Sequence, residues 1–114
     1  MAKVVIDPGH GGIDSGAVGN DIIEKDLNLK ISKYIYDRLK DLGVDVKITR
    51  ETDETLTPDE RVKKILNAFG NTGDVIVISN HINSGGGANP SGKLTFFEKF
   101  IIIGTKYYYY FFAS

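Results

Sequence analysis

The sequence of 114 residues contains no cysteine. This absence excludes disulfide bonds and thiolate-ligated metal sites, and it leaves the redox compartment undetermined. Any metal ion would have to be held by His, Asp or Glu side chains. The chain has only two histidines, so a metal site could contain at most two imidazole ligands from this chain.

The sequence also lacks an excess of charge and a long apolar run. Its 14 basic and 15 acidic residues give a net charge of −1, without the basic footprint of a general nucleic-acid binder. Lys93, Glu98, Lys99 and Lys106 interrupt the apolar C-terminal part, so no stretch approaches the roughly 20 apolar residues that span a bilayer. The first residues show no secretory signal pattern. We expect a monomer with no signal peptide, no membrane span and no nucleic-acid partner.

The order of the expected elements indicates an α/β fold. Strands are predicted at residues 3–6, 44–48 and 74–79, and helices at about 25–42 and from Pro58 to about 69. Thr57 and Glu60 form the pattern of a capping box, and glycines follow both helices. Alternation of this kind predicts a mostly parallel or mixed central sheet flanked by helices, in the order strand, helix, strand, helix, strand.

Each predicted helix has apolar residues at helical spacing, which would face the core. These residues are Leu27, Ile31, Tyr34, Ile35, Leu39 and Leu42 in the first helix, and Val62, Ile65, Leu66 and Phe69 in the second. Residues 9–19 contain five glycines and are expected to form a loop. Residues 94–97 and 101–112 could each form one more strand, and residues 83–92 should form a loop.

Both histidines directly follow an apolar strand. His10 comes just after residues 4–6 and His81 just after residues 75–78. If the two strands are parallel, both imidazoles reach the same edge of the sheet, where ligands bind in open α/β sheets. Glu24 stands at the start of the first helix, which must begin near that edge. Two neutral imidazoles and one carboxylate suit a catalytic zinc ion, which keeps a fourth position for water.

Other interpretations of these residues remain open. A histidine after a strand is more often a structural hydrogen-bonding group, and an acidic residue at a helix start commonly interacts with the helix dipole. The glycines around His10 could serve a tight turn, a close ligand approach or a phosphate site.

Several polar residues near these positions are candidates for supporting roles. Asp7, Asp14 and Asn80 could orient the imidazoles by accepting their free N–H groups, or could simply cap turns. Arg50 and Arg61 could grip an anionic substrate, or pair on the surface with Glu51 and Asp59.

A set of linked motifs resembles one enzyme family. The chain reads VIDPGHGG at residues 5–12, DSGA at 14–17, EKDLNL at 24–29, a Thr-Arg pair before Asp53, and SNHINS at 79–84. In order and spacing these segments resemble the zinc-dependent N-acetylmuramoyl-L-alanine amidases of the amidase 3 type, whose opening motif is DPGHGG. The likeness extends over roughly residues 3–87.

The resemblance implies a function. It implies zinc held by His10, Glu24 and His81, and hydrolysis of the amide between N-acetylmuramic acid and L-alanine in peptidoglycan. Arg50 and Asn83 are then candidate substrate-binding residues. The chain looks like a phage endolysin or a mother-cell autolysin, made in the cytoplasm and acting on the cell wall.

The chain departs from the family pattern after residue 87. We expect residues 1–87 to be the N-terminal part of the catalytic domain, and residues 88–114 to be an atypical, apolar tail that is truncated or frame-shifted. The family's late glutamate, which handles protons, has no clear counterpart, and Glu98 is the only candidate for it. An alternative is therefore an inactive remnant that binds zinc or the cell wall without cutting it.

Overall fold

The computed structural model describes residues 2–70, 74–84 and 94–103, with side chains for residues 2–70 and 74–82. Its elements, in chain order, are β1 (Lys3–Pro8), β2 (Val18–Gly19), β3 (Ile22–Ile23), α1 (Glu24–Asp41), β4 (Val46–Ile48), α2 (Pro58–Ala68), β5 (Val75–Ser84) and β6 (Leu94–Ile103). The predicted alternation of strands and helices is confirmed. The proposed boundary after residue 87 lies outside the described residues.

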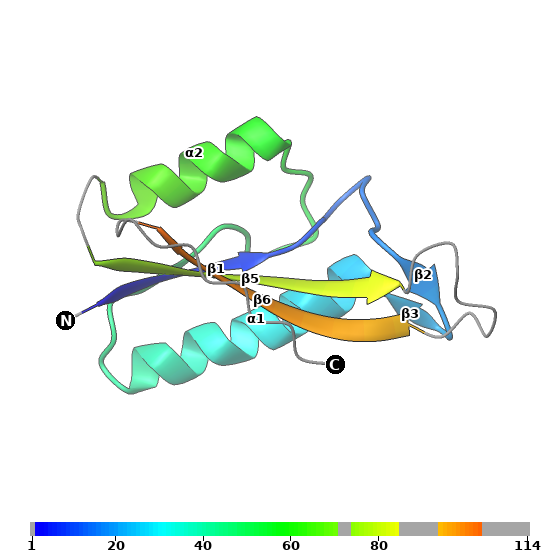
Figure 1. Ribbon diagram of the computed structural model, residues 1–114, viewed down its shortest axis with the longest axis horizontal. Helices are drawn as coiled ribbons and strands as arrows, with labels where there is room; N and C mark the ends of the chain where they lie inside the picture. Colours follow the sequence, from blue (N-terminus) through cyan, green and yellow to red (C-terminus); the bar gives the residue numbers. More distant parts are fainter. Residues whose placement is uncertain (1, 71–73, 85–93, 104–114) are drawn as a thin grey trace.

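The main sheet is mixed, with the strand order β4-β1-β5-β6. β1 runs parallel to both β4 and β5, and β6 runs antiparallel to β5. The helices α1 and α2 cover opposite faces of this sheet (Figure 1). The predicted α/β class is therefore confirmed, and the apolar strands β1 and β5 occupy the centre of the sheet, as expected for strands buried on both faces.

The core between the sheet and α2 is built from valines. Val5, Val75 and Val77 form a buried cluster, against which Ile65 and Phe69 pack. The capping box at Thr57 and Glu60 is present and fixes the start of α2. The two remaining residues of the predicted apolar face lie at its margin, since Val62 and Leu66 are about half exposed.

The inner face of α1 differs in part from the prediction. Its fully buried residues are Glu24, Asn28 and Ser32, which are polar and spaced four apart. Of the predicted apolar face, Tyr34 and Leu42 are 73% and 61% exposed, and the other four residues are half-buried. Four-residue spacing places side chains on one helix face. These three residues have polar partners on the strands and loops that α1 covers, so hydrogen bonds take the place of apolar packing there.

Two further segments differ from the sequence interpretation. The expected loop at residues 9–19 ends in the short antiparallel hairpin of β2 and β3, which leads directly into α1. Residues 94–103 form one antiparallel strand, β6, where the pattern had suggested two separate strands. Residues 104–112 of the second predicted strand lie outside the described part of the chain.

The topology brings three segments to one rim of the sheet. The C-terminal ends of the parallel strands β1 and β5 point the same way, and α1 begins beside them (Figure 1).

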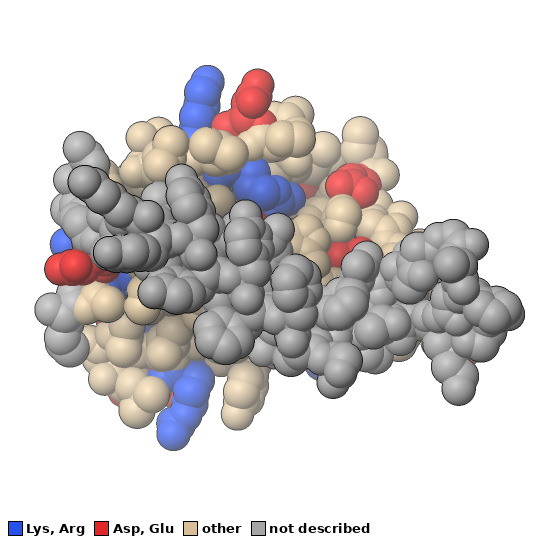
Figure 2. Space-filling model, viewed as in Figure 1, with Lys and Arg blue, Asp and Glu red and all other residues tan. Residues whose placement is uncertain are grey.

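The described surface around α2 carries acidic and basic side chains in mixture (Figure 2). Neither described helix combines the length and the hydrophobicity needed to cross a bilayer.

Candidate metal centre

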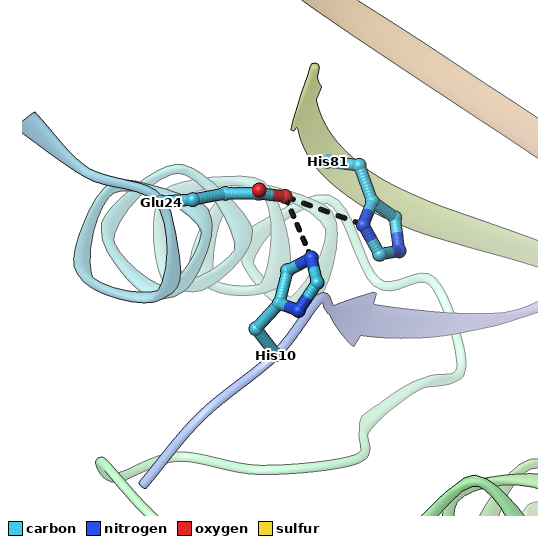
Figure 3. Close-up of side chains that lie close together, drawn as sticks. All are labelled: His10, Glu24 and His81. Atoms are coloured by element: carbon cyan, nitrogen blue, oxygen red, sulfur yellow. Dashed lines mark ion pairs between the residues drawn. The ribbon is translucent and has the colours of Figure 1, made fainter. Parts of the chain in front are cut away.

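Three side chains converge at this rim. His10 follows β1, Glu24 is the first residue of α1, and His81 lies in β5. His10 Nε2 lies 3.0 Å from Glu24 Oε2, and His81 Nδ1 lies 3.3 Å from the same oxygen (Figure 3). One ligand atom from each residue lies within 4.8 Å of the other two, so the group could hold a metal ion.

The spacing of these atoms suits a small tetrahedral ion. Zinc bonds to His nitrogen and carboxylate oxygen are about 2.0–2.2 Å long. Two such ligands at a tetrahedral angle lie roughly 3.3 Å apart, close to the two N–O distances observed here. Both rings direct a nitrogen at one carboxylate oxygen, and the two rings meet edge to face.

The ring of His10 is fixed from its other side. Its Nδ1 lies 2.8 Å from Asp14 Oδ2, so the predicted role of Asp14 in orienting an imidazole is supported by this contact. The hydrogen bond to His10, together with a backbone bond from Gly16, lowers the pKa of Asp14 below its usual value of 3.8. Asp14 therefore remains an anionic acceptor at neutral pH, leaving Nε2 of His10 free to act as a ligand.

Glycines make room for the ligands. A Cβ at Gly9 would lie 2.5 Å from His81 Cε1, and a Cβ at Gly16 would lie 2.7 Å from both Glu24 Oε1 and His10 Cδ2. Gly16 also has a φ of +64°, which other L-residues adopt at a cost. The interpretation of a tight turn that needs positive φ thus holds at Gly16, and these glycines also leave room for the side chains of His10, Glu24 and His81.

The carboxylate of Glu24 is buried, with 3% of its side chain exposed. Its Oε1 accepts a hydrogen bond from the Ala17 amide, and its Oε2 accepts from the Ile82 amide and from Asn28 Nδ2. A buried anion is expensive unless it is hydrogen-bonded. These donors satisfy the buried carboxylate and hold it in position facing the two rings.

His81 is the more exposed side of the group. Its side chain is 38% exposed, which leaves an approach from solvent. Burial lowers the pKa of His81 below its usual value of 6.5, the neighbouring His10 lowers it further, and Glu24 partly opposes both effects. The neutral ring, which is the form that binds a metal ion, is thereby favoured at neutral pH.

The other acid and amide that were candidates for orienting the rings have different partners. Asp7 accepts hydrogen bonds from Thr49 and Ser79 and forms an ion pair with Arg61. Asn80 donates to Ser32 of α1. Both residues tie elements together beneath the site, and neither has a hydrogen bond to an imidazole among the described residues.

The structure does not support the predicted contact of Arg50 with substrate. Arg50 is 2% exposed, and its guanidinium donates to the backbone oxygens of Gly9, Lys25 and Thr52. Arg61 likewise pairs with Asp7 and not with Glu51 or Asp59. Both arginines are directed into the protein because the loop around His10 presents its carbonyl groups to them.

The two remaining predicted residues lie where side chains are not described. Glu98 is placed opposite Asn80 in the β5–β6 ladder, one position before the His81–Phe97 pair. Asn83 lies in β5 opposite Thr95. Their roles in proton transfer and substrate binding stay predictions.

Asn28, Ser32 and Lys25 support the site but were not predicted from the sequence. Asn28 bridges Glu24 and the Gly9 carbonyl, and Lys25 Nζ contacts the Gly12 carbonyl and Asp53. One signal was available, because Asn28 and Ser32 follow Glu24 at four-residue intervals and so share its helix face.

Comparison with known proteins gives the same family as the motifs. A family model described as N-acetylmuramoyl-L-alanine amidase matches residues 4–111. The chain is 48% identical to the uncharacterized protein YqiI of Bacillus subtilis (strain 168) over 83% of this chain and 44% of that protein. It is 41% identical to an endolysin of Bacillus phage SPP1, over 82% of this chain and 32% of the endolysin.

Solved structures include similar folds. The catalytic domain of CwlV, an N-acetylmuramoyl-L-alanine amidase from Bacillus (Paenibacillus) polymyxa var. colistinus, is 39% identical with a TM-score of 0.65, covering 78% of this chain and 50% of that domain. The chain thus spans half or less of the length of each of these proteins. From the linked motifs, the fold and these matches, the chain belongs to the N-acetylmuramoyl-L-alanine amidase family.

Proposed function

We propose that this chain binds zinc through His10, Glu24 and His81 and hydrolyses the amide between N-acetylmuramic acid and L-alanine in peptidoglycan. The observation that carries the proposal is the convergence of two imidazole nitrogens on one buried carboxylate oxygen, at 3.0 and 3.3 Å. Membership of the amidase family supplies the substrate class. A zinc ion held by these three residues would supply Lewis acidity, which would polarise an amide carbonyl and lower the pKa of a water molecule to about 7.

The chain's own residues prepare the site for this chemistry. Asp14 holds the His10 ring through Nδ1, and the Ala17 and Ile82 amides hold the Glu24 carboxylate. A neutral His81 leaves its Nδ1 lone pair available at neutral pH. Its 38% exposed side chain lies on the side from which a polymeric substrate can approach. The ligands are thus oriented before any ion or substrate arrives, which reduces the cost of binding.

The same relatives support a proposal for where the chain acts. One similar protein is a phage endolysin, and we propose that this chain also acts on the bacterial cell wall, as a monomer. Sedimentation of the purified chain would test the oligomeric state. A mass twice that of the chain at micromolar concentration would reject the monomer.

Two measurements test the amidase proposal. The purified chain is titrated with Zn²⁺ by calorimetry, and the metal-loaded protein is then incubated with purified cell walls while newly exposed L-alanine amino groups are quantified. We expect one zinc per chain and release of these amino groups. A folded, zinc-loaded sample that releases none would reject hydrolysis.

A matched pair of variants shows whether the group of His10, Glu24 and His81 is responsible for zinc binding. Glu24→Gln keeps the size of the side chain but places an amide where backbone N–H groups already donate. We expect zinc affinity to fall at least about 100-fold, since loss of a ligand should exceed the 10–100-fold effect of outer partners. Glu51→Gln makes the same change at an exposed position and should bind zinc normally.

Binding without hydrolysis is the second candidate function. It is favoured by the sequence, in which the late glutamate that handles protons in the family has no clear counterpart. Glu98 is the residue we propose for that role on sequence grounds. If the chain cuts cell walls, Glu98→Gln should lower the rate strongly, and an unchanged rate would exclude Glu98 as the proton-transfer group.

A further inference from the structure

Three cationic side chains from three parts of the fold converge on the backbone that carries His10. Arg61 of α2 donates to the Pro8 oxygen at 2.7 Å and to the His10 oxygen at 3.0 Å. Arg50, which follows β4, donates to the Gly9 oxygen at 2.9 Å. Lys25 of α1 donates to the Gly12 oxygen at 2.9 Å. We call residues 8–12 the His10 loop.

The remaining carbonyl of this loop is also satisfied. The Gly11 oxygen accepts from the Asp14 amide at 3.0 Å, so all five carbonyl groups from Pro8 to Gly12 have a donor. Four of the five carbonyl groups accept from a cationic side chain, two of them from Arg61. Cationic groups make shorter and stronger hydrogen bonds than neutral ones, and most of these contacts are partly or fully buried, where water competes little.

The His10 loop needs support from outside because its backbone is in an unfavourable conformation. His10 itself has a φ of +60°, and Gly11 and Gly12 have values of +135° and +58°. A residue other than glycine rarely adopts positive φ unless the surrounding structure enforces it. This conformation is what turns the His10 ring so that Nε2 faces Glu24 while Nδ1 faces Asp14.

The cations are themselves held by acids. Arg61 pairs with Asp7 Oδ1, and Lys25 pairs with Asp53 Oδ2 at 2.9 Å. Asp53 also accepts a hydrogen bond from the Gly12 amide through Oδ1. Lys25 and Asp53 therefore bind the carbonyl and the amide of the same residue, Gly12. The support therefore reaches from the loop to α1, α2 and the segment after β4.

We propose that Arg61, Arg50 and Lys25 are positioning residues that fix the His10 loop and thereby set the affinity of the site for its metal ion. The inference rests on the proposed metal site and adds a function for residues outside the group of metal ligands. If these cations served only to stabilise the fold, their loss would lower the thermal stability without changing the affinity for metal in the protein that remains folded.

The experiment compares three variants of the full chain. Arg61→Lys keeps the charge but cannot donate to the Pro8 and His10 carbonyl groups in the same way, because lysine lacks the planar fork of the guanidinium. Lys25→Met removes the side chain that donates to the Gly12 oxygen, at a position that is 17% exposed. Lys64→Met is the matched control, since Lys64 lies on α2 near Arg61 but donates to Thr49, outside the His10 loop.

The readouts are Zn²⁺ affinity by competition with a chelator, the visible absorption of the Co²⁺-loaded protein, and the Tm of the metal-free protein. We expect Arg61→Lys and Lys25→Met to bind Zn²⁺ roughly tenfold or more weakly with an altered Co²⁺ spectrum. Lys64→Met should match the wild-type affinity and spectrum. Where Arg61→Lys does not fold, Lys25→Met decides.

Two results would overturn the inference. One is wild-type affinity and an unchanged Co²⁺ spectrum in the loop variants. The other is an equal loss of affinity in Lys64→Met, which would show a general effect of stability. A wild-type chain that binds neither ion would instead reject the proposed metal site itself, so failure of the inference and failure of the proposed function give different results.

Discussion

At the scale of single residues, the site depends on one histidine in a strained backbone and another with a shifted pKa. His10 has a positive φ, a conformation that costs about 1–3 kcal/mol in a residue other than glycine. His81 has its pKa lowered by burial and by the neighbouring His10. Strained backbone and shifted pKa values gather at functional sites, and here both features occur in proposed ligands.

The lowered pKa of His81 leads to a prediction for the metal-free protein. In an NMR titration of the ring protons, the midpoint of His81 should lie below 6.5, because burial disfavours the charged ring. The His10→Gln variant assigns the signals, since the chain has only two histidines. A midpoint at or above 6.5 in the folded wild-type protein would contradict the prediction.

The same shift fixes the sign of a pH effect on stability. The folded state takes up the His81 proton less readily than the unfolded state, whose value is close to 6.5. The contribution of His81 is therefore fully present above about pH 6.5 and is lost as the pH falls from there through the lowered folded pKa. Protons also compete with metal for the ring, so zinc binding should weaken over the same acidic range.

At the scale of elements, α2 and α1 show what the sequence could and could not predict. The capping box of α2 was predictable because the Thr57 hydroxyl and the Glu60 amide are three residues apart and interact locally. The inner face of α1 was not, because Asn28 and Ser32 find partners at Gly9 and Asn80. Such long-range polar contacts leave no local pattern, whereas the apolar spacing of α1 reveals only the half-buried residues beside this polar face.

The local character of the α2 cap can be tested. Thr57→Ala removes the side chain that accepts from the Glu60 amide, and the free energy of unfolding in urea should fall by about 1 kcal/mol. Thr52→Ala makes the same change at an exposed residue of the preceding loop and should have an effect below about 0.5 kcal/mol. Equal effects of the two changes would show that the cap does not contribute.

At the scale of the whole molecule, the convergence of the metal group follows from the parallel topology. The motifs predicted that His10 and His81 would meet, because the C-terminal ends of neighbouring parallel strands share one edge. The roles of Arg50 and Arg61 were not predictable in this way. Their partners are carbonyl groups and a buried carboxylate brought together by folding, and an arginine in a sequence does not reveal whether it faces solvent or backbone.

Asp7 is the residue through which this buried polar interior joins the sheet. It lies in β1 with 3% exposure and accepts from Thr49 after β4, from Ser79 in β5 and from Arg61 in α2. A buried ion pair adds little net stability compared with apolar residues, but removing one partner leaves the other charge uncompensated. Asp7→Asn should therefore destabilise the fold and loosen the His10 loop at the same time.

A double-mutant cycle measures this link between the sheet and the loop. Asp7→Asn should lower the free energy of unfolding by about 3 kcal/mol, while Asp45→Asn, at an exposed position, should change it by less than about 0.5 kcal/mol. Combined with Arg61→Met, the cycle should give a coupling energy between about 0.5 and 3 kcal/mol, because the two side chains form an ion pair. Additive effects of the two substitutions would contradict a joint role of Asp7 and Arg61. Because Arg61 also donates to the His10 carbonyl, the affinity for metal should be lower in the Asp7→Asn and Arg61→Met variants as well.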